Sequence, residues 1–213
     1  MKPRLLAAIA TVSFSLAIAP AFAQAPPAPT EINASKLALT LYPAKDSKAL
    51  KVTSPAFKEM GDIPFENTMY RGNVFPGLEW SKGPKGTQSY VLIMQDPDAD
   101  AHGQPILHFT LFNIPAGLTK LDAGMTASPA GSMYGPDMRG AMRPYVGPRP
   151  PPGPKHRYHF QVFALDTILQ GDPAMTWDQM KAQIAGHVLA SGQLIGLGSF
   201  DPTAPKPQQR PPA

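Results

Sequence analysis

The pattern of apolar and polar positions predicts a chain made mostly of β-strands. Three stretches have the length and composition of buried strands, namely residues 90–95 (YVLIMQ), 106–114 (ILHFTLFNI) and 158–165 (YHFQVFAL). The third stretch nearly alternates, which places on one face Tyr158, Phe160, Val162 and Ala164. Residues 50–54 and 192–196 are shorter candidates. Turns rich in proline and glycine separate these segments, so repeated β-α-β units are not expected.

One helix is predicted near the C-terminus. Thr176 is its expected N-cap, and Gln179 completes a capping box with it. Apolar side chains at helical spacing would cover a sheet, and these are Trp177, Met180, Ile184 and Val188. Ser191-Gly192 is expected to end this helix. The predicted architecture is therefore a β-sheet core with a few peripheral helices.

The ends of the chain carry a different signal. Lys2 and Arg4 precede an apolar run, and Ala21-Phe22-Ala23 has the small-x-small pattern that signal peptidase reads. The predicted organisation is a signal peptide at 1–23, a Pro/Ala-rich linker at 24–35, one domain at 36–201 and a disordered Pro-rich tail at 202–213. Cleavage is expected before Gln24, which indicates a periplasmic or secreted protein that does not span a membrane.

Composition narrows the classes of function. The 213 residues carry a formal net charge of +4 and include 27 prolines but no cysteine. Lysine and arginine form no block, so a nucleic-acid partner is not expected. The lack of cysteine excludes disulfides, thiol catalysis and a Cys-based zinc site. The mild basic surplus favours small anionic ligands or anionic lipid surfaces.

Two polar features interrupt the predicted strands. Asp96, Asp98 and Asp100 directly follow a strand, where they could ring a cation, accept hydrogen bonds or simply solvate a turn. His108 lies within an apolar strand, either as a satisfied core residue or as a ligand-binding group.

A third feature is the proline-rich stretch 145–158, which leads His156, Arg157 and Tyr158 into a strand. Imidazole, guanidinium and phenol groups beside such a loop could form an oxyanion site. A polyproline ligand for another protein is the structural alternative. The methionine-rich segment 133–142 is expected to be a variable loop or a flexible lip over the site.

Taken in order, these motifs resemble the phosphatidylethanolamine-binding protein family. The matching elements are DPDA at 96–99, a histidine-bearing strand that leads into FNIPA at 112–116, Y-x-GP-x-PP at 145–151 and HRY at 156–158. The resemblance runs from VTSPAF at 52–57 to GHVLASGQLIG at 186–196, and it is nearest to the bacterial branch called Raf-kinase-inhibitor-like. The combination is far more specific than any one motif.

The resemblance implies a mostly β fold of two antiparallel sheets with a few peripheral helices, and a small anion pocket. The implied ligand-binding residues are Asp96, His108, His156 and Tyr158. The residues implied to support the pocket are Asp98, Gly147, Pro148 and Pro150. Two departures alter the pocket, because Asp100 replaces the usual proline and the aliphatic pair Ile106-Leu107 precedes His108.

The implied function is binding without catalysis. The expected ligand is a phosphate or phospholipid head-group such as phosphoethanolamine, and no metal or cofactor is expected. A kinase or protease inhibitor that binds a protein partner is the alternative. A phosphate-ester hydrolase is less favoured, because the chain has neither a cysteine nor a G-x-S-x-G nucleophile elbow. Bacterial relatives are also expected to pair as homodimers.

Overall fold

The computed structural model describes residues 32–45 and 49–205, and these residues form two stacked sheets. The small sheet is antiparallel and consists of β1 (Val52–Thr53), β3 (Leu78–Trp80) and β6 (Lys120–Leu121) in the order β1-β3-β6. The large sheet has the order β2-β9-β8-β4-β5-β7. Its strands are β2 (Gly61–Asp62), β4 (Ser89–Asp96), β5 (Ile106–Pro115), β7 (Met133–Tyr134), β8 (His156–Leu165) and β9 (Val188–Gly198). The two-sheet, mostly β fold expected from the sequence is confirmed.

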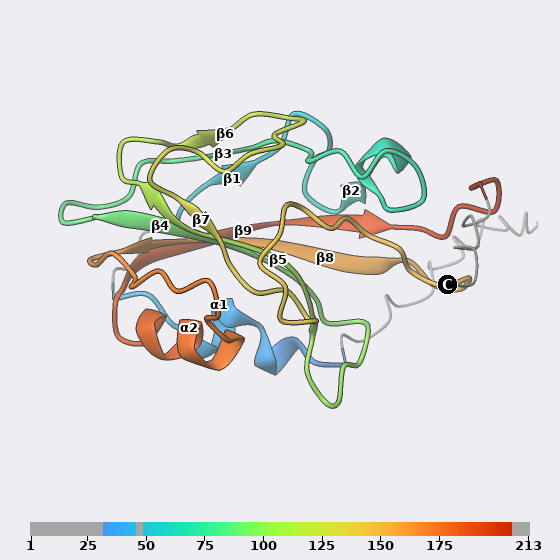
Figure 1. Ribbon diagram of the computed structural model, residues 1–213. Helices are drawn as coiled ribbons and strands as arrows, with labels where there is room; N and C mark the ends of the chain where they lie inside the picture. Colours follow the sequence, from blue (N-terminus) through green and yellow to red (C-terminus); the bar gives the residue numbers. More distant parts are fainter. Residues whose placement is uncertain (1–31, 46–48, 206–213) are drawn as a thin grey trace, which may run out of the picture.

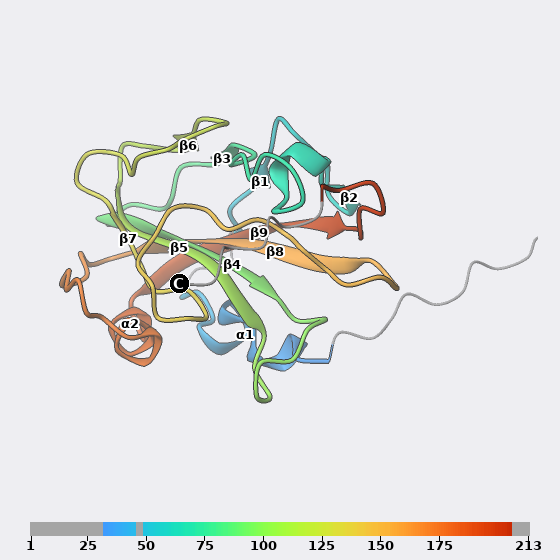
Figure 2. The same cartoon turned by 45° about the vertical axis from the view of Figure 1, so that its right-hand side comes forward.

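Helices cover the face of the large sheet that the small sheet leaves free (Figure 1). They are α1 (Ala38–Leu41) and α2 (Trp177–Ile184), and the view in Figure 2 shows the same three layers from another side. Two single 3-10 turns, at Ala34–Lys36 and Phe65–Asn67, complete the helical elements of the described residues. In the large sheet, only the short β2 runs parallel to its neighbour β9.

The core divides along the two faces of the large sheet. On β8, Tyr158, Phe160 and Val162 pack into the cluster beneath the small sheet. The intervening Phe163 and Leu165 pack into the cluster beneath the helices. This alternation follows from the two-residue period of a strand, and it confirms the predicted face of β8. Every residue of β4 is buried, as the continuous apolar run predicted.

The predicted helix begins where expected but ends early. Thr176 and Gln179 form the capping box, with Gln179 N–H donating to Thr176 Oγ1 at 3.2 Å. The prediction that the helix continues to Ser191 was wrong, because α2 ends at Ile184. Gly186 follows with a φ of 77°, a conformation that glycine adopts without strain, and Val188 opens β9.

The folded part extends slightly beyond the predicted limits of 36 and 201. Asn33 is buried, and its backbone N–H donates to the Pro97 carbonyl at 3.1 Å. Thr203 donates its backbone N–H to Asp201 Oδ1 at 2.9 Å. The predicted signal peptide, most of the linker and the end of the tail lie outside the described residues. Within the described ranges, no helix has the length and apolar character needed to cross a bilayer.

Candidate functional site

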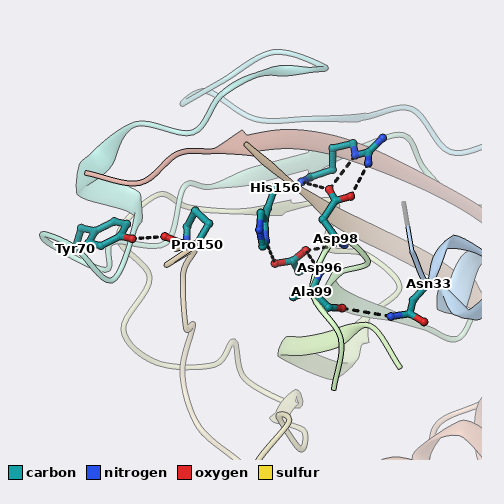
Figure 3. Close-up of polar contacts among 8 residues, drawn as sticks. Asn33, Tyr70, Asp96, Asp98, Ala99, Pro150 and His156 are labelled. Carbon is teal, nitrogen blue, oxygen red and sulfur yellow. Dashed lines mark hydrogen bonds and ion pairs between the residues drawn. The ribbon is translucent and has the colours of Figure 1, made fainter. Parts of the chain in front are cut away.

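The site predicted from the sequence begins with an aspartate and a histidine on neighbouring strands. Asp96 is the last residue of β4 and His156 is the first residue of β8. Because these strands pair in antiparallel fashion, both residues lie at the same end of the strand pair. His156 Nδ1 lies 2.9 Å from Asp96 Oδ2 (Figure 3). Asp96 Oδ1 accepts backbone N–H groups of Asp98 at 2.9 Å and Ala99 at 3.2 Å. The carboxylate therefore holds both the following turn and the imidazole.

This contact favours the protonated form of His156. The hydrogen bond to Asp96 raises the pKa of His156 above its ordinary value, although partial burial of the ring opposes the change. With Nδ1–H directed at the carboxylate, the protonated ring presents Nε2–H on its opposite side. The ring remains reachable, since 16% of the His156 side chain is exposed.

A β-bulge brings His108 towards the same place. Met94 pairs with Phe109 and Gln95 with Leu107, so His108 is the extra residue of β5. Its ring meets the Tyr158 ring edge-on, with centroids 5.2 Å apart. No local pattern predicted this bulge, which turns His108 towards the small-sheet side together with Phe109.

Tyr158 connects the two histidines. It lies two residues after His156 on one face of β8, and the two rings stack at a centroid distance of 6.5 Å. Burial raises the pKa of Tyr158, and the nearby Asp96 carboxylate raises it further, so the phenol stays neutral. Burial lowers the pKa of His108, whose Nε2 is buried with no hydrogen-bond partner among the described residues. The structure thus brings together the four residues predicted to bind the ligand.

Asp98 and Arg157 form a buried ion pair beside this cluster. Arg157 donates its backbone N–H at 2.7 Å and its Nε–H at 2.9 Å to Asp98 Oδ2, and its Nη2 group donates to Oδ1. Burial alone would raise the pKa of Asp98, but these hydrogen bonds outweigh it and lower the pKa. Asp98 therefore holds the start of β8 through Arg157. The guanidinium considered as an anion donor in the sequence is bound to this carboxylate instead.

Gly147 shows why the proline-rich loop has glycine at this point. Its backbone N–H donates to Asn73 Oδ1 at 2.7 Å, and a Cβ there would lie 2.4 Å from the Asn67 carbonyl oxygen. No residue with a side chain could approach so closely without displacing the backbone.

The prolines of the loop are fixed by the same neighbouring segment. The Pro148 carbonyl accepts the Met69 N–H at 2.9 Å, and the Pro150 carbonyl accepts the Tyr70 hydroxyl (Figure 3). The segment 67–73, which the sequence analysis did not connect with the site, thus supports the three predicted loop residues. Its contacts join residues far apart in the sequence, so no local sequence pattern predicts them.

Asp100, noted above as the replacement of the usual proline, lies in the loop between β4 and β5. Its Oδ1 accepts the Gly103 N–H at 2.6 Å and the Asn33 side-chain amide at 3.3 Å. Asp100 therefore closes its own turn.

A cavity of about 440 Å³ opens beside His108. It is lined by Met69, Asn73, Leu107, His108, Asp137, Met138, Arg139, Arg143, Pro144, Tyr145 and Val146. Of the four residues predicted to bind the ligand, only His108 reaches this lining. Arg139 lies within the methionine-rich segment and Arg143 directly follows it, and the sequence did not predict a role for either arginine.

The residues of this cluster occur in the order shared by one protein family. The sequence profile described as Phosphatidylethanolamine-binding protein matches residues 53–199. The chain belongs to the phosphatidylethanolamine-binding protein family. The match contains every residue predicted to bind the ligand, together with the supporting loop.

Individual relatives agree with this family assignment. A UPF0098 protein of Methanothermobacter thermautotrophicus is 36% identical over 151 residues, which cover 70% of this chain and 97% of that protein. LppC of Mycobacterium tuberculosis, named as a candidate lipoprotein, is 34% identical over 160 residues, covering 75% of this chain and 76% of LppC. The crystal structure of a phosphatidylethanolamine-binding protein homologue from Chlamydia trachomatis gives a TM-score of 0.66 at 29% identity, covering 73% of this chain and 100% of that one.

In this family member, the site combines hydrogen-bond donors with one carboxylate. Two histidines and a phenol offer N–H and O–H donors, and the one carboxylate among them is already occupied by three donors. Within the described ranges, no group of three or more His, Asp or Glu side chains is placed to hold a metal ion.

Proposed function

We propose that the protein binds a phosphate-type oxyanion, such as the head-group of a phospholipid, at the cluster of His108, His156 and Tyr158. The observation that carries the proposal is the 2.9 Å contact between His156 and Asp96. It favours an imidazolium with a free Nε2–H, a donor that also carries positive charge. Membership of a family named for phosphatidylethanolamine binding supports the same reading.

The remaining donors act as neutral groups. The Tyr158 hydroxyl stays protonated because burial raises the pKa of the phenol. Burial lowers the pKa of His108, which favours the neutral imidazole. An anion bound beside Nε2 would favour protonation of this ring. So few donors should bind an anion weakly on their own. A dissociation constant in the millimolar range corresponds to a binding free energy of only about −4 kcal/mol. A substituent on the anion would supply the rest.

Binding without turnover is part of the proposal. Asp96 is placed to orient His156 and the turn that follows β4, since Oδ2 contacts His156 and Oδ1 accepts two backbone N–H groups. A hydrolase, or an inhibitor that acts on a protein partner, is the alternative. Hydrolysis of a phosphomonoester that disappears in His108→Ala would overturn this part.

Export is the proposed setting of this activity. The N-terminal sequence has the three regions of a signal peptide with cleavage before Gln24, and it favours a periplasmic or secreted protein. The name of the mycobacterial relative, a candidate lipoprotein, supports the same setting. Mass spectrometry of the protein recovered from the periplasm would give the mature N-terminus, and an intact Met1 there would contradict the proposal.

The decisive experiment is an NMR titration of the mature protein with inorganic phosphate and phosphoethanolamine. Wild type should show saturable shifts in the His108, His156 and Tyr158 signals, and His156→Ala should lose them. His187→Ala is the matched control, because His187 pairs with Asp166 at the far end of β8 and β9. Phosphate binding that survives in His156→Ala would refute the site.

A further inference from the structure

The segment that precedes the family match packs against the turn that follows β4. The profile match begins at residue 53, whereas the first described segment is 32–45. Asn33 is 5% exposed, and its backbone N–H donates to the Pro97 carbonyl at 3.1 Å. Its side-chain amide donates to the Ala99 carbonyl at 3.3 Å (Figure 3) and to Asp100 Oδ1 at 3.3 Å. One residue from outside the matched region thus holds three residues of this turn.

The same turn is bonded to the candidate site. The Ala99 N–H donates to Asp96 Oδ1 at 3.2 Å, and Asp96 Oδ2 lies 2.9 Å from His156 Nδ1. Ala99 therefore contacts Asp96 through its N–H and Asn33 through its carbonyl, a series that Figure 3 shows. A movement of the turn would displace the carboxylate that orients the imidazole.

Two buried glutamines of the large sheet fix the segment in place. The first backbone N–H groups of α1 receive no side-chain cap from the residue that precedes the helix. Gln95 Oε1 accepts the Ala38 N–H at 2.8 Å, and Gln161 Oε1 accepts the Leu39 N–H at 2.7 Å. Gln95 directly precedes Asp96 in β4. The segment is therefore attached to the strand that carries the carboxylate of the site.

Asp100 supplies an acceptor that the usual proline would lack. Its Oδ1 accepts the Asn33 amide at 3.3 Å and the Gly103 N–H at 2.6 Å, whereas a proline side chain accepts no hydrogen bond. Lys36 of the same segment donates from its ammonium group to the Gly103 carbonyl. The contact between Asn33 and Asp100 thus depends on a position at which this chain departs from the family pattern.

We propose that Asn33 is a positioning residue of the candidate site, which acts through the turn 97–100 on Asp96 and so on His156. The segment 32–41 is then part of the binding unit, whereas the sequence predicted a linker up to residue 35. The consequence for anion affinity rests on the proposed function. The consequence for the contact between Asp96 and His156 does not.

The pKa of His156 reports where the Asp96 carboxylate lies. The hydrogen bond to Asp96 raises this pKa most and the Asp98 carboxylate raises it further, while burial and the Arg157 guanidinium lower it. Asn33→Ala changes none of these charges, so it can act on His156 only through their placement. The backbone of Asn33 has a φ of −119°, outside the left-handed region, so alanine fits the same conformation.

An NMR pH titration of the histidines in the mature protein tests the proposal. In Asn33→Ala, the pKa of His156 should fall towards its ordinary value, and the amide protons of Asp98 and Ala99 should exchange faster with solvent. Phosphate affinity at neutral pH should fall by about two- to tenfold, the range that one hydrogen bond spans. Asn33→Ser, whose single O–H can donate to one acceptor at most, is the second variant and should shift the pKa in the same direction. An unchanged His156 pKa in these variants would overturn the proposal.

Two comparisons separate positioning from a general loss of stability. Asn113 donates to the Leu169 carbonyl at 2.9 Å and accepts the Leu169 N–H at 2.8 Å, at the other end of β5. Asn113→Ala should therefore destabilise the protein without moving the His156 pKa, and an equal shift in this variant would refute the role of Asn33. In an Asp96→Asn background, Asn33→Ala should cause no further shift, because the carboxylate through which it acts is absent. A further shift of the same size there would also refute it.

Failure of this inference differs from failure of the proposed function. If wild type binds no phosphate while Asn33→Ala still lowers the pKa of His156, the anion site is wrong and the positioning role stands. If phosphate binds through His156 while Asn33→Ala changes neither the pKa nor the affinity, the positioning role alone is wrong.

Discussion

His156 and Asp96 meet across the pairing of β8 with β4, with Nδ1 and Oδ2 2.9 Å apart. The same carboxylate accepts two backbone N–H groups of the turn that follows β4. Its side chain is 3% exposed, so all three hydrogen bonds form away from bulk water. One buried carboxylate thus couples the shape of the turn to the charge of the imidazole.

Asp96→Asn should separate these roles. The amide oxygen can still accept from the turn, but the loss of charge should return the pKa of His156 towards its ordinary value of about 6.5. Phosphate affinity at neutral pH should fall, and the free energy of unfolding should drop by about 1–3 kcal/mol. Histidine NMR titration and urea unfolding measure both. Asp166→Asn, next to the exposed His187, is the control and should leave the His156 pKa unchanged.

The raised pKa of His156 determines how the contribution of this residue to stability changes with pH. Its contribution is fully present below the unfolded pKa of about 6.5 and is lost as the pH rises through the higher folded pKa. His108 has a lowered pKa and acts in the opposite sense. The comparison is therefore between wild type and His156→Gln, whose stability difference should shrink as the pH rises from about 6.5 through the folded pKa of His156. A difference that stays constant over this range would contradict the assignment.

The ion pair between Asp98 and Arg157 should matter far more than exposed pairs. Their side chains are 8% and 14% exposed, so Asp98→Asn removes a charge that Arg157 contacts away from bulk water and should cost about 3 kcal/mol. The lowered pKa of Asp98 places this contribution above about pH 3.9, and it is lost as the pH falls through the folded pKa. Urea unfolding at neutral pH measures the loss.

The matched control for this prediction is Asp122→Asn. Asp122 pairs with Lys120 on the surface, where the two side chains are 84% and 57% exposed. Solvent screens such pairs, so the unfolding midpoint should not move. Equal losses in Asp98→Asn and Asp122→Asn would show that burial of the first pair is unimportant.

Local pattern was enough to predict the parts of the fold that depend on local chemistry. The alternation in β8 gave the face of Tyr158, and the capping box at Thr176 gave the start of α2. The end of α2 could not be read in the same way. Val188 fits both the helical spacing from Ile184 and the two-residue alternation of β9, and the conformation of Gly186 decides between them.

The candidate site depended more on family resemblance than on pattern. The contact of Asp96 with His156 requires β4 and β8 to be neighbours, which residues 60 positions apart do not reveal locally. The pairing of Arg157 with Asp98 has the same non-local origin. The bulge at His108 also changes the direction of its side chain. Strict alternation along β5 would have placed the His108 side chain on the opposite face of the sheet.

Gly198 should control the position of Tyr158. A Cβ at residue 198 would lie 2.4 Å from Cε2 of the Tyr158 ring and 3.1 Å from Cβ of Pro148. Gly198→Ala should therefore displace the ring, weaken phosphate binding and destabilise the protein by about 1–3 kcal/mol, as overpacking does. Calorimetry with phosphate and urea unfolding measure the two effects.

Two further variants make this prediction specific. Gly117→Ala adds a methyl group with nothing within 4 Å and should leave both stability and affinity unchanged. Combining Gly198→Ala with Tyr158→Leu should recover stability, because the smaller side chain relieves the overlap, while phosphate binding stays lost with the phenol. Recovery of binding in the double variant would mean that Tyr158 donates nothing to the anion, and that the two histidines alone define the site.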